Sequence, residues 1–226
     1  MPQLNLHPVF TSFARAVAAR FAFLHRHTEA LTQAAARAKF DTRNWTPELL
    51  RQLEWRRFEE LCVAYYEASG FTTHVSDAGA DGSVDIILQA QDSEQPFSVA
   101  RCKAWDAYRV GIKAVKDLRA SATAAKIADA VLLTSGRFTQ EALDLGRKEK
   151  IEMVDGAGLL DKLAALPPEK SQALLRFATS GDFLTPTCPR CAIKMISRQS
   201  TKGGRKFWGC RNYPECKQTI FTSAPG

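Results

Sequence analysis

The sequence has no long uninterrupted apolar stretch. Residues 8–40 are rich in Ala and Phe and predict a helix, but Arg15, Arg20 and Arg26 interrupt the apolar positions. A membrane-spanning helix needs about 20 consecutive, mostly apolar residues, so the pattern excludes a membrane span in this segment. With 45% hydrophobic and 24% charged residues, the composition is typical of a soluble globular protein.

Acidic residues are missing from the start of the chain, where Glu29 is the first. A basic, acid-free segment is typical of a transit peptide or of a helix that seeks a membrane surface. Packing on the body or on a second subunit is the alternative, and residues 1–44 are treated as a helical segment without an assigned role. A secretory signal is also missing, because residues 1–14 lack a basic start and no small-residue cleavage pattern follows. We therefore expect a cytoplasmic protein.

Excess positive charge is missing from most of the chain. The formal net charge is +7, and the last 41 residues hold eight Lys or Arg against one acid, Glu215. The 23 basic and 23 acidic residues that precede them balance. A small basic module on a neutral body predicts binding to a polyanion.

Cysteine is scarce outside the same basic end. Cys62 and Cys102 stand alone in apolar stretches, and we expect them to pack as small hydrophobic residues. The other four form two pairs, one separated by two residues and one by five, which suits a closed structural zinc site. A disulfide is disfavoured in a reducing cytoplasm, and an iron–sulfur cluster would not explain the basic flanks. The expected zinc ligands are Cys188, Cys191, Cys210 and Cys216.

Basic and aromatic residues are interleaved around these cysteines. The mixture suits single-stranded or distorted nucleic acid, because cations can contact phosphates while rings stack on bases. Phe207 and Trp208 have a second interpretation, since one of them can form a small core over the zinc. The candidate nucleic-acid contacts are Lys194, Arg198, Arg205, Lys206, Trp208, Arg211, Tyr213 and Lys217.

The same residues carry a family resemblance. Cys-Pro-x-Cys, a following Met195, Phe-Trp-Gly-Cys at 207–210 and Asn-Tyr-Pro-x-Cys-Lys at 212–217 resemble the C-terminal zinc finger of bacterial type I topoisomerases. The resemblance covers residues 188–222. It implies a small zinc-ribbon-like finger that binds DNA, mainly single-stranded, and performs no chemistry.

Helix and strand patterns alternate between residues 45 and 166. Thr46 and Pro47 mark a helix start, and apolar residues then recur at helical spacing as far as Gly70. Three strand patterns are followed by a strand–helix alternation, which predicts a β-meander that continues into parallel crossover units. We expect strands at 71–75, 84–88, 97–102, 130–134 and 151–154, helices at 112–125, 138–149 and 157–166, and a linker at 167–187.

A candidate catalytic pair lies on two of these strands. Asp85 is on one strand of a hairpin and Lys103 is at the end of its partner, so the two side chains can meet at one end of the sheet. Metal-dependent phosphodiester cleavage uses a carboxylate to hold Mg²⁺ and a lysine to orient water or neutralise developing charge. Taken alone the pair is a weak indication, because any hairpin can carry one.

A longer series of residues surrounds the pair in a fixed order. It comprises Trp55-x-x-Phe58-Glu59, Asp81-Gly82-x-Val84-Asp85, Cys102-Lys103-x-Trp105, Thr134-Ser135-Gly136-x-Phe138 and Val154-Asp155-Gly156. This series resembles the Mrr-type restriction endonuclease domain, a member of the PD-(D/E)xK nuclease superfamily, over residues 45–166. The resemblance implies an α/β fold with a mixed central sheet flanked by helices, and a role in DNA restriction.

The resemblance also implies roles for single residues. Asp85 would be the principal Mg²⁺ ligand and Lys103 the catalytic lysine. Glu59 would be an accessory carboxylate at the Mg²⁺ ion or its water, and the backbone carbonyl of Cys102 a further ligand. The turn at 134–136 would bind a phosphate through its amides. A homodimer is implied as well, because cutting both strands often takes two such sites.

Arg101 departs from the family pattern. The position two before the lysine is expected to be Glu, Asp or Gln, and here it is Arg101. A guanidinium is always charged and cannot bind Mg²⁺. We expect it to lie beside Asp85, where it could form a salt bridge in the metal position.

Three functions are consistent with these patterns. The first is an Mg²⁺-dependent DNA endonuclease that the zinc finger targets to DNA. The second is a catalytically degenerate DNA-binding protein in which Arg101 replaces the usual Glu or Gln. The third is an adaptor tethered through the N-terminal segment, in which the finger binds protein. Retained Asp85, Glu59 and Lys103 favour the first function and Arg101 favours the second, while strong salt dependence of binding would argue against the third.

Overall fold

The computed structural model describes residues 41–76, 85–90, 93, 95–104, 109–200 and 203–221. The helix expected within residues 8–40 lies outside the described residues. The chain divides into one unit that ends at Asp41 and a second that runs from Thr42 to Gly226. Within the described residues, no helix is long and apolar enough to cross a membrane.

The first helical region is broken into two helices. Helix α2 (Pro47–Gln52) starts as expected, with Thr46 Oγ1 accepting a hydrogen bond from the Leu49 amide at 3.1 Å. A second helix, α3 (Trp55–Ala68), begins only after Glu54, whose backbone is extended and whose side chain caps α3. The single helix expected as far as Gly70 is therefore wrong at Glu54, because a charged residue acts there as an N-cap.

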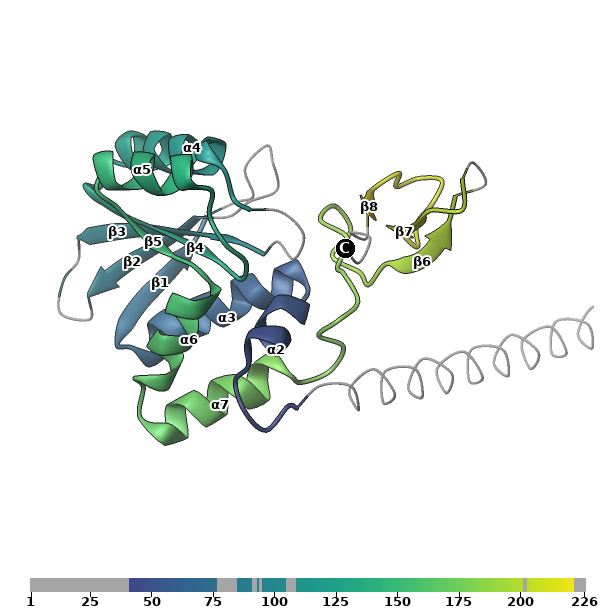
Figure 1. Ribbon diagram of the computed structural model, residues 1–226, viewed down its shortest axis with the longest axis horizontal. Helices are drawn as coiled ribbons and strands as arrows, with labels where there is room; N and C mark the ends of the chain where they lie inside the picture. Colours follow the sequence, from purple (N-terminus) through teal and green to yellow (C-terminus); the bar gives the residue numbers. More distant parts are fainter. Residues whose placement is uncertain are drawn as a thin grey trace, which may run out of the picture. The chain divides into compact units, whose positions relative to one another are not determined.

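Five strands form one mixed sheet in the order β1-β2-β3-β4-β5. Pairing is antiparallel from β1 to β3 and parallel from β3 to β5. This arrangement confirms the expected meander followed by crossover units (Figure 1). The strands are β1 (Phe71–Val75), β2 (Asp85–Ala90), β3 (Pro96–Lys103), β4 (Asp129–Thr134) and β5 (Ile151–Val154).

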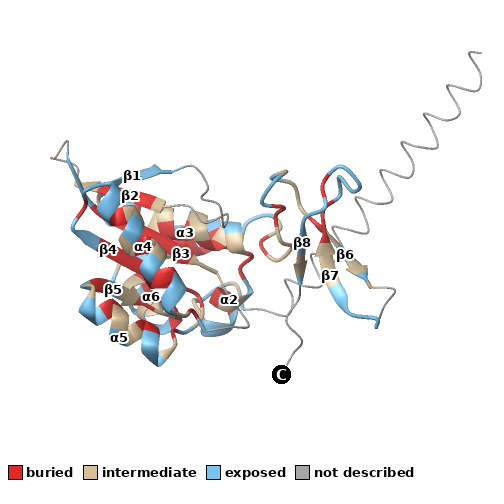
Figure 2. Ribbon diagram, turned by 90° about the horizontal axis from the view of Figure 1, so that it is seen from above, coloured by how far each residue is buried: buried red, intermediate tan, exposed pale blue. Residues whose placement is uncertain are grey.

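Helices cover both faces of this sheet. Helices α4 (Ile112–Ala124) and α5 (Gln140–Lys148) lie on one face, and α3 and α6 (Gly156–Ala164) lie on the other (Figure 1). The middle strands β3 and β4 are consequently buried along most of their length, as Figure 2 shows. Strands that are buried on both faces need near-continuous apolar sequence, and this is why polar Arg101 stands out in β3.

The segment expected as a linker contains a helix that packs on the body. Helix α7 (Pro168–Ala178) contacts α3 and buries Leu174 and Leu175. Arg57 of α3 donates to the Phe177 carbonyl at 2.6 Å, which ties the two helices together. Pro167 and Pro168, the first residues of the expected linker, instead open this helix, because proline is well tolerated in the first helical turn.

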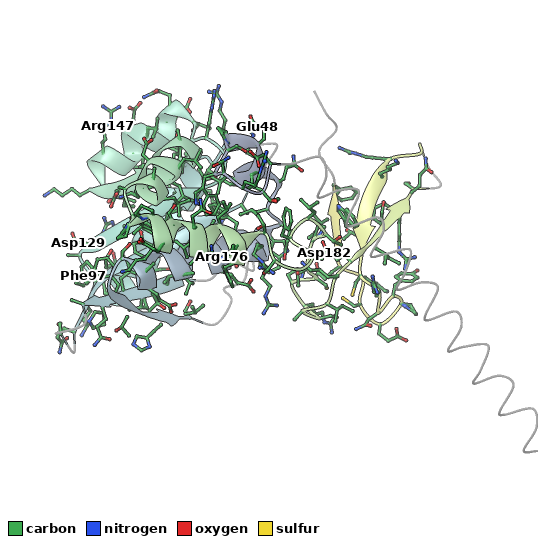
Figure 3. All side chains as sticks on the ribbon, turned by 90° about the horizontal axis from the view of Figure 1, so that it is seen from below. Glu48, Phe97, Asp129, Arg147, Arg176 and Asp182 are labelled. Atoms are coloured by element: carbon green, nitrogen blue, oxygen red, sulfur yellow. The ribbon has the colours of Figure 1, made fainter. Side chains whose placement is uncertain are left out.

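The four-cysteine region forms its own small sheet. Strands β6 (Ile196–Gln199), β7 (Lys206–Gly209) and β8 (Thr219–Phe221) are antiparallel, in that order. Before it, Asp182 accepts hydrogen bonds from the Leu184 and Thr185 amides in the turn that follows α7 (Figure 3). The term ribbon below refers to residues 185–221, and the term body to residues 45–178.

Candidate functional site

Strand pairing brings Asp85, Arg101 and Lys103 to one end of the sheet. Asp85 opens β2 and lies directly opposite Arg101 of β3 in the antiparallel register. Side chains of cross-strand partners share one face, as do those of residues two apart. Lys103 therefore follows Arg101 on the same face, at the end of β3.

Arg101 and Asp85 form a buried ion pair. The Arg101 Nε and one terminal nitrogen donate to the two Asp85 carboxylate oxygens at 2.6 and 2.8 Å. The same terminal nitrogen donates to Ser121 Oγ of α4 at 2.8 Å. Only 8% of the Arg101 side chain and 13% of the Asp85 side chain are exposed. The salt bridge anticipated from the sequence is confirmed, in the bidentate geometry that binds a carboxylate most firmly.

This arrangement does not fit Mg²⁺. The ion takes oxygen ligands at about 2.0–2.1 Å in near-octahedral geometry, whereas both Asp85 oxygens already accept hydrogen bonds from a guanidinium. Lys103, two residues after Arg101 on β3, adds a second positive charge at this end of the sheet. Among the described residues, the four clustered cysteines are the only group of three or more potential metal ligands. As long as Arg101 engages both oxygens of Asp85, the residues present do not fit Mg²⁺, and no catalytic step through the ion follows from them.

Glu59 is a carboxyl whose surroundings favour the protonated form when no metal ion is bound. It lies on α3, which packs against β1 and β3. Burial raises the pKa of Glu59 from 4.5 to about 8, although nearby Lys103 acts in the opposite direction. At pH 7 the carboxyl is therefore mostly protonated and neutral.

The turn after β4 supports the end of β3. Thr134 Oγ1 donates to the Lys103 carbonyl at 2.8 Å and accepts from the Gly136 amide at 3.1 Å. Thr134 and Ser135 are both buried. The Gly136 amide therefore already has a partner within the turn, which argues against the phosphate site expected here, and Thr134 instead holds the strand that carries Lys103.

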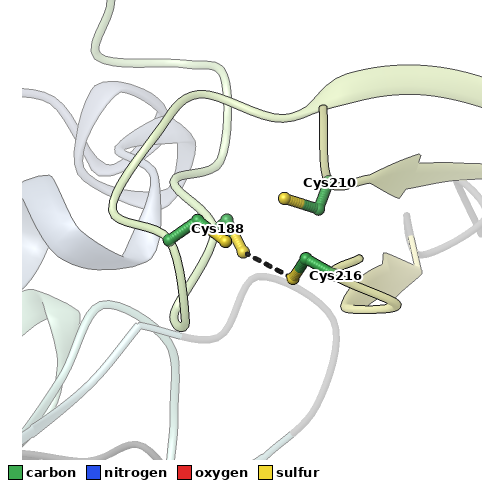
Figure 4. Close-up of side chains that lie close together, drawn as sticks. Cys188, Cys210 and Cys216 are labelled. Atoms are coloured by element: carbon green, nitrogen blue, oxygen red, sulfur yellow. Dashed lines mark hydrogen bonds between the residues drawn. The ribbon is translucent and has the colours of Figure 1, made fainter. Parts of the chain in front are cut away.

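The four cysteines fit a tetrahedral zinc ion. Their sulfur atoms all lie within 4.8 Å of one another, and Cys188 Sγ is 3.8 Å from Cys216 Sγ (Figure 4). Zn–S bonds of about 2.3 Å in a tetrahedron imply sulfur–sulfur distances of about 3.8 Å. Cys188, Cys191, Cys210 and Cys216 would hold the ion in a closed structural site, in which it supplies folding energy rather than chemistry.

The two aromatic residues of β7 have different surroundings. Trp208 packs against the cysteine cluster, so it belongs to the small core over the metal site. Phe207 instead lies beside Phe221 of β8, with ring centroids 6.2 Å apart. Of the two interpretations open for these residues, the small core holds for Trp208.

Arginines and exposed rings share the surface of the ribbon. Arg198 lies over the Tyr213 ring at 5.5 Å, and Arg205 lies over the Phe221 ring at 5.6 Å. Tyr213 and Phe221 are 61% and 63% exposed. Phe221 is a further candidate contact that the sequence patterns did not indicate, because no strand was expected at Thr219–Phe221.

Lys194 differs from the other expected nucleic-acid contacts. Its ammonium donates to Glu54 Oε1 and to the Thr185 carbonyl, each at 2.9 Å. This cation is therefore engaged within the chain. The other basic residues of that set lie on strands or loops of the ribbon, and Lys206, Arg211 and Lys217 are exposed.

Replacing Arg101 by Gln is expected to lower the free energy of unfolding by about 3–5 kcal/mol, because Asp85 would be left buried without its partner. Chemical denaturation measures the change. Arg147→Gln is the matched control, since its pair with Asp144 is well exposed and should contribute little. The double variant Asp85→Asn/Arg101→Gln should recover much of the loss. Equal stability of Arg101→Gln and the parent protein would contradict a buried ion pair.

Glu59 is expected to make stability depend on pH. Its pKa is about 8 in the folded chain and 4.5 ordinarily, so the folded state retains a proton that the unfolded state releases. The stability associated with this proton is fully present below about pH 4.5 and is lost as the pH rises through about 8. Thermal unfolding from pH 5 to 8.5 should show Glu59→Gln gaining stability relative to the parent as the pH rises. Glu60→Gln changes a neighbouring carboxylate that pairs with Arg56 and Arg57 and adds only a small part of the Glu59 shift, so it should show a much smaller trend. Parallel curves for Glu59→Gln and the parent would refute the shift.

Curated relatives match the ribbon region of the chain. DNA topoisomerase 1 of Archaeoglobus fulgidus is 38% identical over 77 residues, which are 33% of this chain and 12% of the relative. DNA topoisomerase 1 of Mycoplasma pneumoniae is 34% identical over 50 residues, 22% of this chain and 7% of the relative. The chain thus spans only a small part of the length of these enzymes.

Two solved restriction endonucleases are similar to the chain. The DNA modification-dependent restriction endonuclease AspBHI aligns with a TM-score of 0.42 at 18% identity, covering 62% of this chain and 41% of that one. MspJI restriction endonuclease, in complex with a 27-mer oligonucleotide, aligns with a TM-score of 0.36 at 16% identity, covering 59% and 34%.

Family models match both parts of the chain. A topoisomerase DNA-binding C4 zinc finger model matches residues 185–224, which contain the four cysteines. The restriction endonuclease model matches residues 50–163, half of the chain, and this range contains the whole five-stranded sheet. The chain therefore belongs to the Mrr-type restriction endonuclease family and carries a topoisomerase-type zinc ribbon after its family domain.

Proposed function

We propose that this protein binds DNA without cleaving it, through a restriction-endonuclease fold in which Arg101 replaces the catalytic metal ion. The bidentate contact of Arg101 with Asp85 carries the proposal. DNA is the partner that both family models suggest, and a DNA-binding role is consistent with a cytoplasmic location.

Charge balance explains how such a site accepts a phosphate without a metal ion. In a metal-dependent nuclease, the cation compensates the carboxylates that would otherwise repel the DNA backbone. Here the Arg101 guanidinium neutralises Asp85, and burial keeps Glu59 mostly protonated at neutral pH. Lys103 then leaves this end of the sheet positive, which favours a phosphate.

The ribbon provides the second DNA contact in this proposal. Tyr213 and Phe221 are exposed rings with arginines beside them. Rings that alternate with cations are suited to single-stranded DNA, because bases stack on the rings and phosphates contact the cations. Trp208 packs against the cysteine cluster and Lys194 binds Glu54, so neither is included. The candidate contacts are Arg198, Arg205, Lys206, Arg211, Tyr213, Lys217 and Phe221.

An Mg²⁺-dependent endonuclease is the second candidate function. Asp85 and Lys103 on adjoining strands favour it, because they retain the spacing of the nuclease motif. It requires Arg101 to leave Asp85 when DNA and metal bind. The homodimer expected for double-strand cleavage belongs to this candidate.

DNA binding and cleavage by the zinc-loaded protein distinguish the two. Fluorescence anisotropy with single-stranded and duplex oligonucleotides should show salt-sensitive binding that is equal with and without Mg²⁺. Phe221→Ala and Tyr213→Ala should each weaken single-strand binding by about 5- to 160-fold, given a stacking contribution of about 1–3 kcal/mol. Phe177→Ala changes an exposed ring outside the ribbon and should have no effect.

Supercoiled plasmid tests cleavage in the same samples. With Mg²⁺ or Mn²⁺ present, we expect the plasmid to remain intact with the parent protein and with Asp85→Asn. Metal-dependent nicking by the parent that Asp85→Asn abolishes would refute the proposal and establish the second candidate. Absence of salt-sensitive DNA binding would reject both.

A further inference from the structure

Glu54 is a buried carboxylate at the start of helix α3. Its side chain is only 2% exposed, and its backbone amide donates to the Phe183 carbonyl at 2.9 Å. One carboxylate oxygen accepts from the Arg56 amide at 3.1 Å and so caps α3. A buried charge costs free energy unless it is paired and hydrogen-bonded, so the remaining partners of Glu54 matter for stability.

Those partners come from the ribbon. Lys194 Nζ and Thr187 Oγ1 donate to Glu54 Oε1 at 2.9 and 2.8 Å, and the Thr187 amide donates to the other oxygen at 3.2 Å. Next to Glu54, the Trp55 indole donates to the Thr187 carbonyl at 2.7 Å. Four hydrogen bonds therefore join Glu54 and Trp55, the cap and the first residue of α3, to Thr187 and Lys194 of the ribbon.

The zinc knuckle determines where these two ribbon residues lie. Thr187 immediately precedes Cys188, and Thr187 and Lys194 are paired in an antiparallel bridge across the knuckle. The Cys188 amide donates to the Ile193 carbonyl at 2.8 Å inside that bridge. Closing the knuckle around a metal ion therefore fixes the spacing between the two residues that contact Glu54.

We infer that Glu54 couples zinc binding in the ribbon to the folding of helix α3 in the body. The zinc-loaded knuckle presents Thr187 and Lys194 to Glu54 together, whereas an open knuckle leaves a buried carboxylate without its cation. The ribbon is then a fixed part of the body rather than an arm on a flexible linker. This inference does not depend on whether the protein binds or cleaves DNA.

Hydrogen exchange and thermal unfolding of the full-length chain, zinc-loaded and zinc-stripped, test the coupling. In the parent protein, removal of zinc should increase amide exchange in the first turns of α3 and lower the melting temperature of the body by about 4 °C or more. In Glu54→Gln, α3 should exchange at nearly the same rate with and without zinc. Glu60→Gln changes a carboxylate of the same helix that pairs with Arg56 and Arg57 rather than with the ribbon, and it should respond as the parent does.

Reciprocity provides the second measurement, because a coupling between two sites acts equally in both directions. Competition with a chelator should show that Glu54→Gln and Lys194→Met each weaken zinc binding by about tenfold or more. Lys217→Met, at an exposed lysine of the same ribbon, should bind zinc as the parent does. Equal α3 exchange in the loaded and stripped parent, or parental zinc affinity in Lys194→Met, would overturn the inference.

Discussion

The ion pair between Arg101 and Asp85 determines what this end of the sheet can do. It lies at the place where the resemblance to the Mrr-type domain predicts a metal ion, and it uses both oxygens of the carboxylate. Ser121 of α4 fixes the guanidinium from a third direction, so the pair is also part of the packing between the sheet and its covering helix. A charge that holds the fold together cannot also be easily displaced by a cation.

A second buried carboxylate has the same dependence on a partner. Glu54 caps α3 and binds Lys194 and Thr187, so its partners come from the segment that carries the zinc ligands. The restriction-endonuclease fold and the ribbon meet at this residue. The inferred coupling therefore links the zinc ligands of the ribbon to the start of one helix of the body, α3.

Much of the fold could be predicted from the sequence, because apolar periodicity and helix caps are local. Thr46, the five strands and the four cysteines are examples. Contacts between distant residues could not be predicted in the same way. Helix α7 lies in a segment expected to be a linker. Glu54, which caps α3 through the nearby Arg56 amide, also accepts a hydrogen bond from the amide of Thr187, 133 residues away. Lys194 illustrates the same limit. The basic residues around it in the sequence indicate a nucleic-acid contact, but its partner in the structure is Glu54.

Binding of Mg²⁺ or Mn²⁺ to the zinc-loaded protein tests the central claim most directly. Isothermal titration should detect no binding that depends on Asp85, because Arg101 already occupies both carboxylate oxygens. Binding of the same ions to the Arg101→Gln variant, which lacks the guanidinium, is measured under the same conditions for comparison. Binding of the ion by the parent protein, abolished by Asp85→Asn, would contradict the account and return this site to the metal-dependent nucleases.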